Sequence, residues 1–166
     1  MKIITKYEKD KGKILKSIFD LLNKNKLLTL STSYKNKPYS NTCYYAYDKE
    51  FNLYFWSEKN ALHSKNILRN KKIAVNIFNS NQKWGSNLQG IQGLGKAFVV
   101  NNKELIKGGF LYIKRYPKVL KFVKNLKDFH SNKFASRIYK IELEKIKLFD
   151  ERTFGKDEFR EIIIKK

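Results

Sequence analysis

The stretch from Ser136 to Phe149 constrains the fold more than any other part of this chain. Its apolar residues alternate with polar ones, which is the period of a β-strand with one buried face, but the alternation shifts parity between Leu143 and Ile146. A shift of parity inside one strand requires a β-bulge, which bends the strand and increases its twist. The sequence therefore predicts a long, bent strand in a curved antiparallel sheet.

A second segment, from Leu88 to Val100, indicates the same curvature. It reads LQGIQGLGKAFVV and carries glycine at positions 90, 93 and 95. Glycine weakens a strand and usually marks a bulge, a sharp barrel corner or the close approach of another group. These glycines do not form a phosphate-binding loop, because no Gly-Lys-Ser or Gly-Lys-Thr sequence follows and the next helix begins too late.

Shorter strands and several helices complete the pattern. The expected strands are Leu27–Ser33, Asn41–Tyr47, Leu53–Ser57 and Ile73–Phe78, and the expected helices are Gly12–Asn25, Ala61–Asn70, one from Lys103 and one from Pro117. This order lacks the regular alternation of strand and helix that a doubly wound fold needs. The sequence predicts a mainly β protein, a small antiparallel barrel with peripheral helices.

The composition limits the cellular compartment in which the protein is expected and the kinds of site that it can contain. The single cysteine, Cys43, allows neither an intramolecular disulfide nor a cysteine cluster for a metal, and the two histidines, His63 and His130, lie far apart in the sequence. We therefore expect a cytoplasmic protein without a metal site. No window approaches about 18 uninterrupted apolar residues, so we expect no secretory signal and no membrane partner.

The formal net charge of +21 attracts phosphate backbones and other anionic surfaces. However, only 5 of the 36 basic residues are Arg, and the lysines are spread along the whole chain. Arg is the preferred residue for bidentate phosphate and base contacts, whereas scattered Lys mainly keeps a surface solvated. We interpret the charge as a solvated surface rather than a nucleic-acid site. The alternative is a non-enzymatic binder of nucleic acid or of another anionic surface.

The stretch from Leu53 to Ile67, LYFWSEKNALHSKNI, is a candidate anion site. An apolar strand ends in a Trp-Ser pair, crosses a short polar turn and enters a helix that carries His63. Unpaired amides at a helix N-terminus point outward and favour negative charge. The same residue pattern is also compatible with an ordinary strand-to-helix turn.

Four segments together resemble the pyridoxamine 5′-phosphate oxidase-like family of FMN-binding split barrels. They are LLTLSTSYKNKPYSN, LYFWS followed by ALHSKNILRNKKIAVNIF, GIQGLGKAFVV and RIYKIELEKIKLFD. The tail, KIKLFDERTFGKDEF, is most similar to the YhbP-like branch of that family. The resemblance implies a six-stranded antiparallel split β-barrel with N-terminal and inserted helices. It also implies one domain over residues 1–166, with a core of 12–150 and a C-terminal tail of 151–166.

The resemblance further implies a homodimer with FMN in each of two clefts between subunits. The protein would then be an FMN-dependent oxidoreductase of unknown substrate, and no residue is identified as catalytic. Residues of several kinds are candidates for the cofactor site: phosphate contacts, nearby cations, a rim aromatic and amides for the flavin edge. They are Asn41, Trp56, Ser57, Lys59, His63, Lys65, Trp84, Gln89 and Gln92.

Three positions depart from the family pattern. Asn41 and Leu62 stand where an Arg is common, and Ala46 stands where a Lys is common. A phosphate needs charge-assisted donors to offset its desolvation, so these departures bear on FMN rather than on the fold. Haem or a deazaflavin in the same cleft is the alternative. Only His63 and His130 could serve as a histidine ligand to haem iron.

Overall fold

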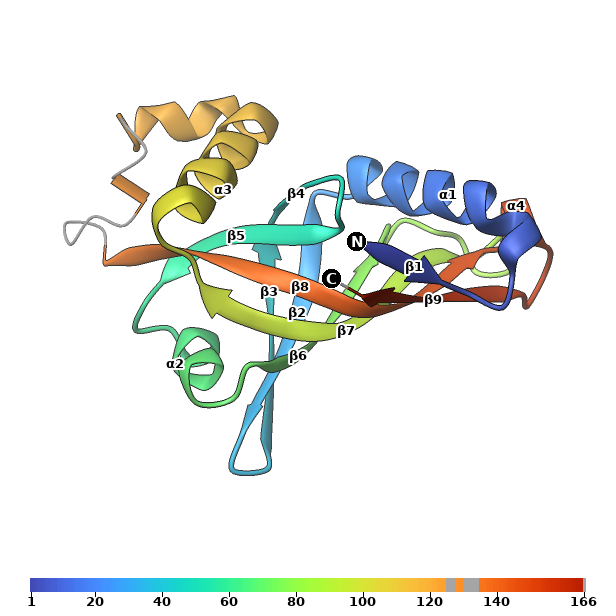
Figure 1. The fold of residues 1–166 in the computed structure, drawn as a ribbon, viewed down its shortest axis with the longest axis horizontal. Coiled ribbons are helices and arrows are strands. Elements are labelled where there is room, and N and C mark those ends of the chain that lie inside the picture. The colour runs from blue at the N-terminus through green and yellow to red at the C-terminus, as the bar shows by residue number, and fades with distance from the viewer. Residues whose placement is uncertain (125–127, 130–134, 166) are drawn as a thin grey trace.

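The computed structural model describes residues 1–124, 128–129 and 135–165, and within them one antiparallel sheet of nine strands curls into a barrel (Figure 1). The strands are β1 (Lys2–Ile4), β2 (Leu27–Tyr34), β3 (Lys37–Tyr44), β4 (Ala46–Tyr47), β5 (Asn52–Glu58), β6 (Lys72–Phe78), β7 (Gln89–Val99), β8 (Ser136–Asp150) and β9 (Phe159–Lys165). The helices are α1 (Lys11–Lys24), α2 (Leu62–Arg69), α3 (Asn102–Arg115) and α4 (Glu151–Phe154), with 3-10 turns η1 (Glu8–Asp10) and η2 (Pro117–Lys121).

The six strands of the predicted barrel are β2, β3, β5, β6, β7 and β8, and five of them lie within one residue of their expected bounds. The prediction of a single strand Asn41–Tyr47 was wrong, because β3 begins at Lys37 and ends at Tyr44, and Ala46–Tyr47 form the separate strand β4. Three short strands extend this set. β4 pairs with β5, while β9 pairs with β8 and carries β1 on its other edge. The C-terminal tail therefore adds one strand, β9, to the sheet, and its pairing with β1 brings the two ends of the chain side by side (Figure 1).

Strand β8 organises the barrel because it pairs with three other strands. Its first half pairs with β5, its second half with β9, and β7 lies along its other edge. The register with β7 shifts between Leu94 and Gly95, which confirms the predicted bulge. A side chain at Gly95 would overlap the backbone carbonyl of Glu142. Glycine is therefore required where the two strands come closest.

We expect a Gly95→Ala substitution to lower the free energy of unfolding by about 3 kcal/mol, because the added methyl group forces the two backbones apart. Gly12→Ala is a matched control: no atom lies within 4 Å of the added carbon, and alanine favours the helix by at most about 1 kcal/mol. Urea unfolding followed by circular dichroism measures both changes. Equal stability of the two variants would contradict the close approach seen at Gly95.

The paired strands β5 and β8 are covered on both faces. Phe55 and Tyr139 point into the barrel and stack with ring centroids 5.0 Å apart, in contact with the core that α1 also covers. Tyr54 and Ile138 point the other way, into a second apolar cluster beneath α3. A Cβ at Gly108 would lie 2.7 Å from the Tyr54 ring, so glycine lets α3 approach this face closely.

Arg115, at the end of α3, joins this helix to the end of α1. Its Nη2 donates hydrogen bonds to the carbonyl oxygens of Leu22 and Asn25, at 2.6 and 2.7 Å. Its guanidinium also lies over the rings of Tyr45 and Tyr47, at 5.0 and 4.9 Å from their centroids. These contacts satisfy backbone carbonyls that the end of α1 leaves without partners.

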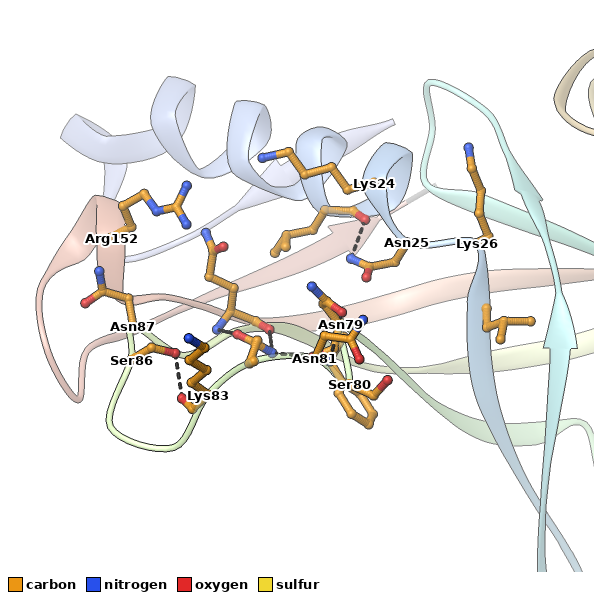
Figure 2. Close-up of a pocket in the computed structure, with 15 residues that line it drawn as sticks. Lys24, Asn25, Lys26, Asn79, Ser80, Asn81, Lys83, Ser86, Asn87 and Arg152 are labelled. Carbon is orange, nitrogen blue, oxygen red and sulfur yellow. Dashed lines mark hydrogen bonds between the residues drawn. The ribbon is translucent and has the colours of Figure 1, made fainter.

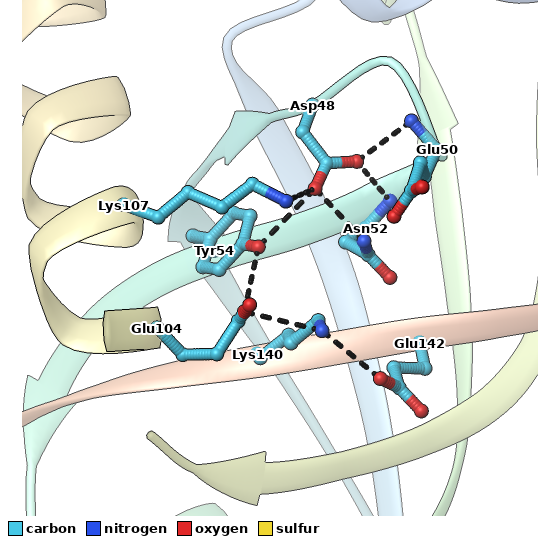
Figure 3. A network of polar contacts seen from close by, with 8 residues as sticks. All are labelled: Asp48, Glu50, Asn52, Tyr54, Glu104, Lys107, Lys140 and Glu142. Atoms are coloured by element: carbon cyan, nitrogen blue, oxygen red, sulfur yellow. Dashed lines mark hydrogen bonds and ion pairs between the residues drawn. The ribbon is translucent and has the colours of Figure 1, made fainter. Parts of the chain in front are cut away.

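A polar network holds the beginning of α3 to the barrel (Figure 3). Lys107 on α3 forms an ion pair of 2.6 Å with the buried carboxylate of Asp48. The Tyr54 hydroxyl lies 3.2 Å from Asp48 and 3.0 Å from Glu104 of α3, and Lys140 on β8 pairs with Glu104 at 3.1 Å. The side of α3 that faces the barrel is thus fixed by side chains from three elements.

The protonation of Asp48 is set by this network. Burial alone raises the pKa of the Asp48 carboxyl, but hydrogen bonds from Asn52 and Lys107 outweigh burial and hold the pKa below its ordinary value of 3.8. A carboxyl whose pKa is lowered by folding stabilises the protein above its unfolded pKa, and this contribution is lost as the pH falls through the folded value.

We therefore expect Asp48→Asn to lower the free energy of unfolding at pH 7 by about 2 kcal/mol, because Lys107 and Tyr54 lose a charged partner. The loss should shrink as the pH falls below about 4, where wild-type Asp48 also becomes protonated. Urea unfolding at pH 7, 4 and 3 measures the difference, with the exposed Asp20→Asn as the control. A difference that does not depend on pH would contradict the role given to the Asp48 charge.

Within the described residues, no helix combines the length and the apolar character needed to cross a bilayer.

Candidate functional site

The turn from β5 to α2 brings two of the predicted site residues together. Ser57 lies near the end of β5 and His63 in the first turn of α2, and the Ser57 Oγ is 2.7 Å from the His63 Nε2. Which of the two atoms donates depends on the tautomer of the imidazole. Ser64, the next residue, donates from its hydroxyl to the carbonyl of Glu58 at 2.7 Å, which holds the turn closed.

His63 is buried, and burial lowers the pKa of its imidazole below the ordinary value of 6.5. The ring is therefore mainly neutral at pH 7. A neutral imidazole can accept or donate a hydrogen bond, but it does not supply the positive charge that a Lys would bring to a phosphate. The positive charge that a phosphate would need at this corner must therefore come from residues other than His63.

Arg137 on β8 lies opposite Ser57 in the sheet. The two residues are paired in the register of β5 and β8, so their side chains share one face. Tyr139 lies two residues along that face, where its ring stacks on Phe55. The sequence gives no sign that Arg137 lies beside Ser57, because this proximity arises only from the pairing of two strands that are distant in the chain.

Asn41 lies on the same side of the sheet as this corner. It pairs with the buried Leu30 across β2 and β3, and Tyr39, two residues away on the same face, lies parallel to the His63 ring with centroids 6.5 Å apart. The Oδ1 atom of Asn41 is buried and has no hydrogen-bond partner within the described protein. A buried polar atom without a partner is costly, so a ligand group that reaches it would be favoured.

Three other candidates lie outside the Ser57–His63 pair: one is on the opposite face of β5 and two are exposed lysines. Trp56 is on the opposite face of β5 from Ser57, where its ring packs edge-on against Phe129 at 5.3 Å. Lys59 donates its backbone amide to the carbonyl of Ala135, and its side chain is exposed. Lys65 lies on the exposed face of α2. Of the two lysines, Lys59 is the nearer in sequence to Ser57.

Gln89 and Trp84 lie at the other end of the barrel. Gln89 pairs with Asp150 on β8, whereas Ser57 pairs with Arg137 on the same strand. The two pairing positions are thirteen residues apart along β8 (137 to 150). The Gln89 side-chain amide donates to Asp150 at 2.6 Å. The loop before β7 carries Trp84, which is fully exposed. One chain by itself therefore does not bring these two residues to Ser57 and His63.

Gln89 also lines a pocket of about 580 Å³ between the end of α1, the loop from β6 to β7, and α4 (Figure 2). In this view Lys24 and Arg152 lie on one side of the pocket and Lys83 on the other. Lys26 is the fourth cation of the lining, which contains no carboxylate. The pocket has a positive potential, but it is separate from the corner at Ser57.

Gln92 lies on the outer face of the barrel. It points to solvent from β7 and lines a groove of about 360 Å³ beside Leu94 and Asn76. Leu94 and Phe78 are both large apolar side chains with about half of their surface exposed. The groove also carries Lys145, Lys147 and Glu161, so this outer face is a mixed one in which exposed apolar side chains lie among polar and charged ones.

The three departures from the family pattern supply no cation. Ala46 is buried in the apolar cluster beneath α3, and Leu62 is exposed at the start of α2. Asn41 is uncharged. Among the described residues no group of three or more His, Cys, Asp and Glu is placed to hold a metal ion. His130 lies outside the described residues.

Comparison with solved structures identifies the fold of this chain as a split barrel. Three of the similar structures are a candidate pyridoxamine 5′-phosphate oxidase from Listeria innocua, general stress protein 26 from Bacillus anthracis and a heme binding protein from Mycobacterium smegmatis. Their TM-scores are 0.61, 0.62 and 0.68, at 16%, 18% and 11% sequence identity. The alignments cover 81%, 88% and 89% of this chain, and 97%, 96% and 55% of the respective structures.

These similarities concern the fold. The chain spans little more than half the length of some of the matched structures, 55% and 56% in two cases. No protein-family model and no curated protein sequence matches the chain.

We expect the imidazole of His63 to titrate below pH 6.5, because its burial disfavours the charged form. Nuclear magnetic resonance of the histidine ring protons, assigned with His63→Gln, measures this pKa. Ser57→Ala should change the chemical shifts of His63 because it removes the hydroxyl at 2.7 Å. A His63 signal that titrates above 6.5 would contradict the buried, neutral ring.

Proposed function

We propose that this protein is a homodimeric split barrel that binds FMN at the corner between β5 and α2. The observation that carries the proposal is the buried, unpartnered Oδ1 of Asn41 on the same side of the sheet as the Ser57–His63 pair. A ligand with hydroxyl and phosphate groups offers the hydrogen bonds that such a corner can use.

The residues present fit a phosphate group. Ser57 supplies a hydroxyl, Arg137 supplies a guanidinium on the same face of the sheet, and the first-turn amides of α2 add partial positive charge. Lys59, on the turn between β5 and α2, adds a solvent-exposed cation near the corner. Arg137 and Lys59 thereby take over the role of the family's missing basic residues.

A second copy of the chain would complete the site. Gln89, Gln92 and Trp84 are distant from Ser57 within one chain, whereas Gln92 lies on an outer face that also exposes Leu94 and Phe78. Pairing two barrels through this face would bury apolar surface and place amides of one copy at the cleft of the other. The cofactor would then lie between subunits.

Bound FMN would supply redox chemistry, and the protein would supply position and electrostatics. In this proposal Ser57, Arg137 and the α2 amides orient the phosphate, while Asn41 accepts a hydrogen bond from the cofactor. The substrate remains open, and no residue is assigned as its acid or base. An oxidoreductase is the class of enzyme that this arrangement supports.

Haem is the second candidate, since one similar structure is a heme binding protein. However, the Nε2 of His63 is engaged by Ser57, and the ring is buried. Ligation of iron through that nitrogen would require breaking the 2.7 Å contact. This geometry favours FMN over haem, and a deazaflavin would use the same corner. The relation to the YhbP-like branch also stays a prediction.

We expect FMN to bind with its fluorescence quenched, and Ser57→Ala, His63→Ala and Arg137→Gln each to weaken binding about tenfold, since each removes a hydrogen bond or a charge near the phosphate. Riboflavin, which lacks the phosphate, should bind more weakly than FMN and respond less to Ser57→Ala and Arg137→Gln. Arg152→Gln, which removes an exposed cation in the separate pocket, is the matched control.

Sedimentation velocity of the same preparations tests the dimer, and Leu94→Lys should both dissociate it and weaken FMN binding. Haemin and a deazaflavin are titrated in parallel with FMN. A protein that ignores FMN at about 100 μM, or whose affinity for FMN is unchanged by the substitutions at Ser57 and Arg137, would refute the proposed site.

A further inference from the structure

The lobe formed by α3 and η2 exposes large apolar side chains that the barrel does not use. Ile106, Phe110, Leu120 and Phe122 are exposed by 57%, 62%, 52% and 64%. Ile106 and Phe110 are one helical turn apart and therefore share a face of α3. Single exposed apolar residues are ordinary, but four within seventeen residues (106 to 122) indicate an interaction surface.

The opposite side of α3 is fixed against the barrel, so these residues cannot turn inward. Gly108 lies against Tyr54, and the aromatic ring of Tyr112 packs on Phe129. Lys107 is paired with Asp48 at 2.6 Å. The lobe lies at the edge of the molecule, above the end of β5 in Figure 1, and it meets α1 where Arg115 bonds to the end of that helix.

The charges of the lobe are almost all positive. Residues 103–124 contain seven basic side chains and one acidic side chain, Glu104, which faces Tyr54 and Lys140 of the barrel. Two of the basic side chains are used within the fold, by the ion pair of Lys107 and the hydrogen bonds of Arg115. The five others are exposed: Lys103, Lys114, Lys118, Lys121 and Lys124.

These charges decide which partner fits the surface. A second copy meeting this lobe through its own lobe would place the five lysines opposite five more, and Glu104, the one carboxylate of residues 103–124, is already paired with Lys140. An uncharged apolar partner would offer no anionic group for the exposed lysines to contact. The interface of an anionic bilayer accepts both groups, since apolar side chains enter the acyl boundary while lysines extend to the headgroups.

We propose that α3 and η2 form a peripheral binding surface for bilayers that contain anionic phospholipid. Ile106, Phe110, Leu120 and Phe122 enter the interface, and the exposed lysines of the lobe contact the headgroups. Peripheral contact of this kind requires no spanning helix, so it differs from the membrane span that the sequence excluded. It is also independent of the cofactor site, which lies at the β5–α2 corner.

Flotation of the full chain with vesicles tests the proposal. The protein should float with vesicles of phosphatidylcholine and phosphatidylglycerol, but not with vesicles of phosphatidylcholine alone. Raising NaCl from about 0.1 M to about 0.5 M should release most of it, because the headgroup contacts are screened. Failure to float with the anionic vesicles at the lower salt concentration would overturn the proposal.

Paired variants separate the lobe from the general charge of the protein. Ile106→Gln with Phe110→Gln, and Lys103→Gln with Lys114→Gln, should each reduce binding at least about tenfold. Two matched controls should bind like the wild type: Leu62→Gln with Leu68→Gln on the exposed face of α2, and Lys13→Gln with Lys16→Gln on α1.

Thermal unfolding confirms that each variant is folded before its binding is compared. Equal losses in the lobe variants and in the α1 control would mean that net charge alone drives binding, and would overturn the assignment to this lobe. A wild-type dimer that dissociates in the Ile106 and Phe110 variant would show that a second copy covers the surface, and would likewise overturn the proposal.

Discussion

The pairing of β8 with three other strands is the constraint on which the rest of the structure depends. Its first half holds β5 and its second half holds β9, while β7 follows its other edge through the bulge at Gly95. Because β5 is fixed in this way, the turn that follows it is fixed as well. Ser57 and His63 therefore meet at a position that the backbone pairing determines.

The two faces of the β5–β8 pair explain why the corner between β5 and α2 is separate from the lobe of α3 and η2. Ser57 and Arg137 lie on the face that α2 covers, whereas Tyr54 and Ile138 lie on the face that α3 covers. Alternation along a strand sends neighbouring residues to opposite sides. One strand can thus support a polar site on one face and an apolar seat for a helix on the other.

The basic residues of the protein have different surroundings at the β5–α2 corner and on α3. At the β5–α2 corner, burial lowers the pKa of His63, and Arg137 is the basic residue paired with Ser57 in the sheet. On α3, Lys107 is held by Asp48, while the outward lysines surround exposed apolar side chains. Lysine therefore anchors α3 to the barrel on one side of the helix and is exposed to solvent on the other side.

The sequence by itself determined the antiparallel barrel, because alternation in residues 136–149 and the glycines of 88–100 report directly which side chains are buried and where strands bend. It also placed Ser57 and His63 in one turn, since they are only six residues apart. It did not show that Trp56 points away from Ser57 into an apolar cluster, that Arg137 lies beside Ser57, or that β1 and β9 pair. Those facts depend on contacts between segments that are distant in the chain, and only the tertiary structure decides such contacts because register and helix docking are set by the whole core.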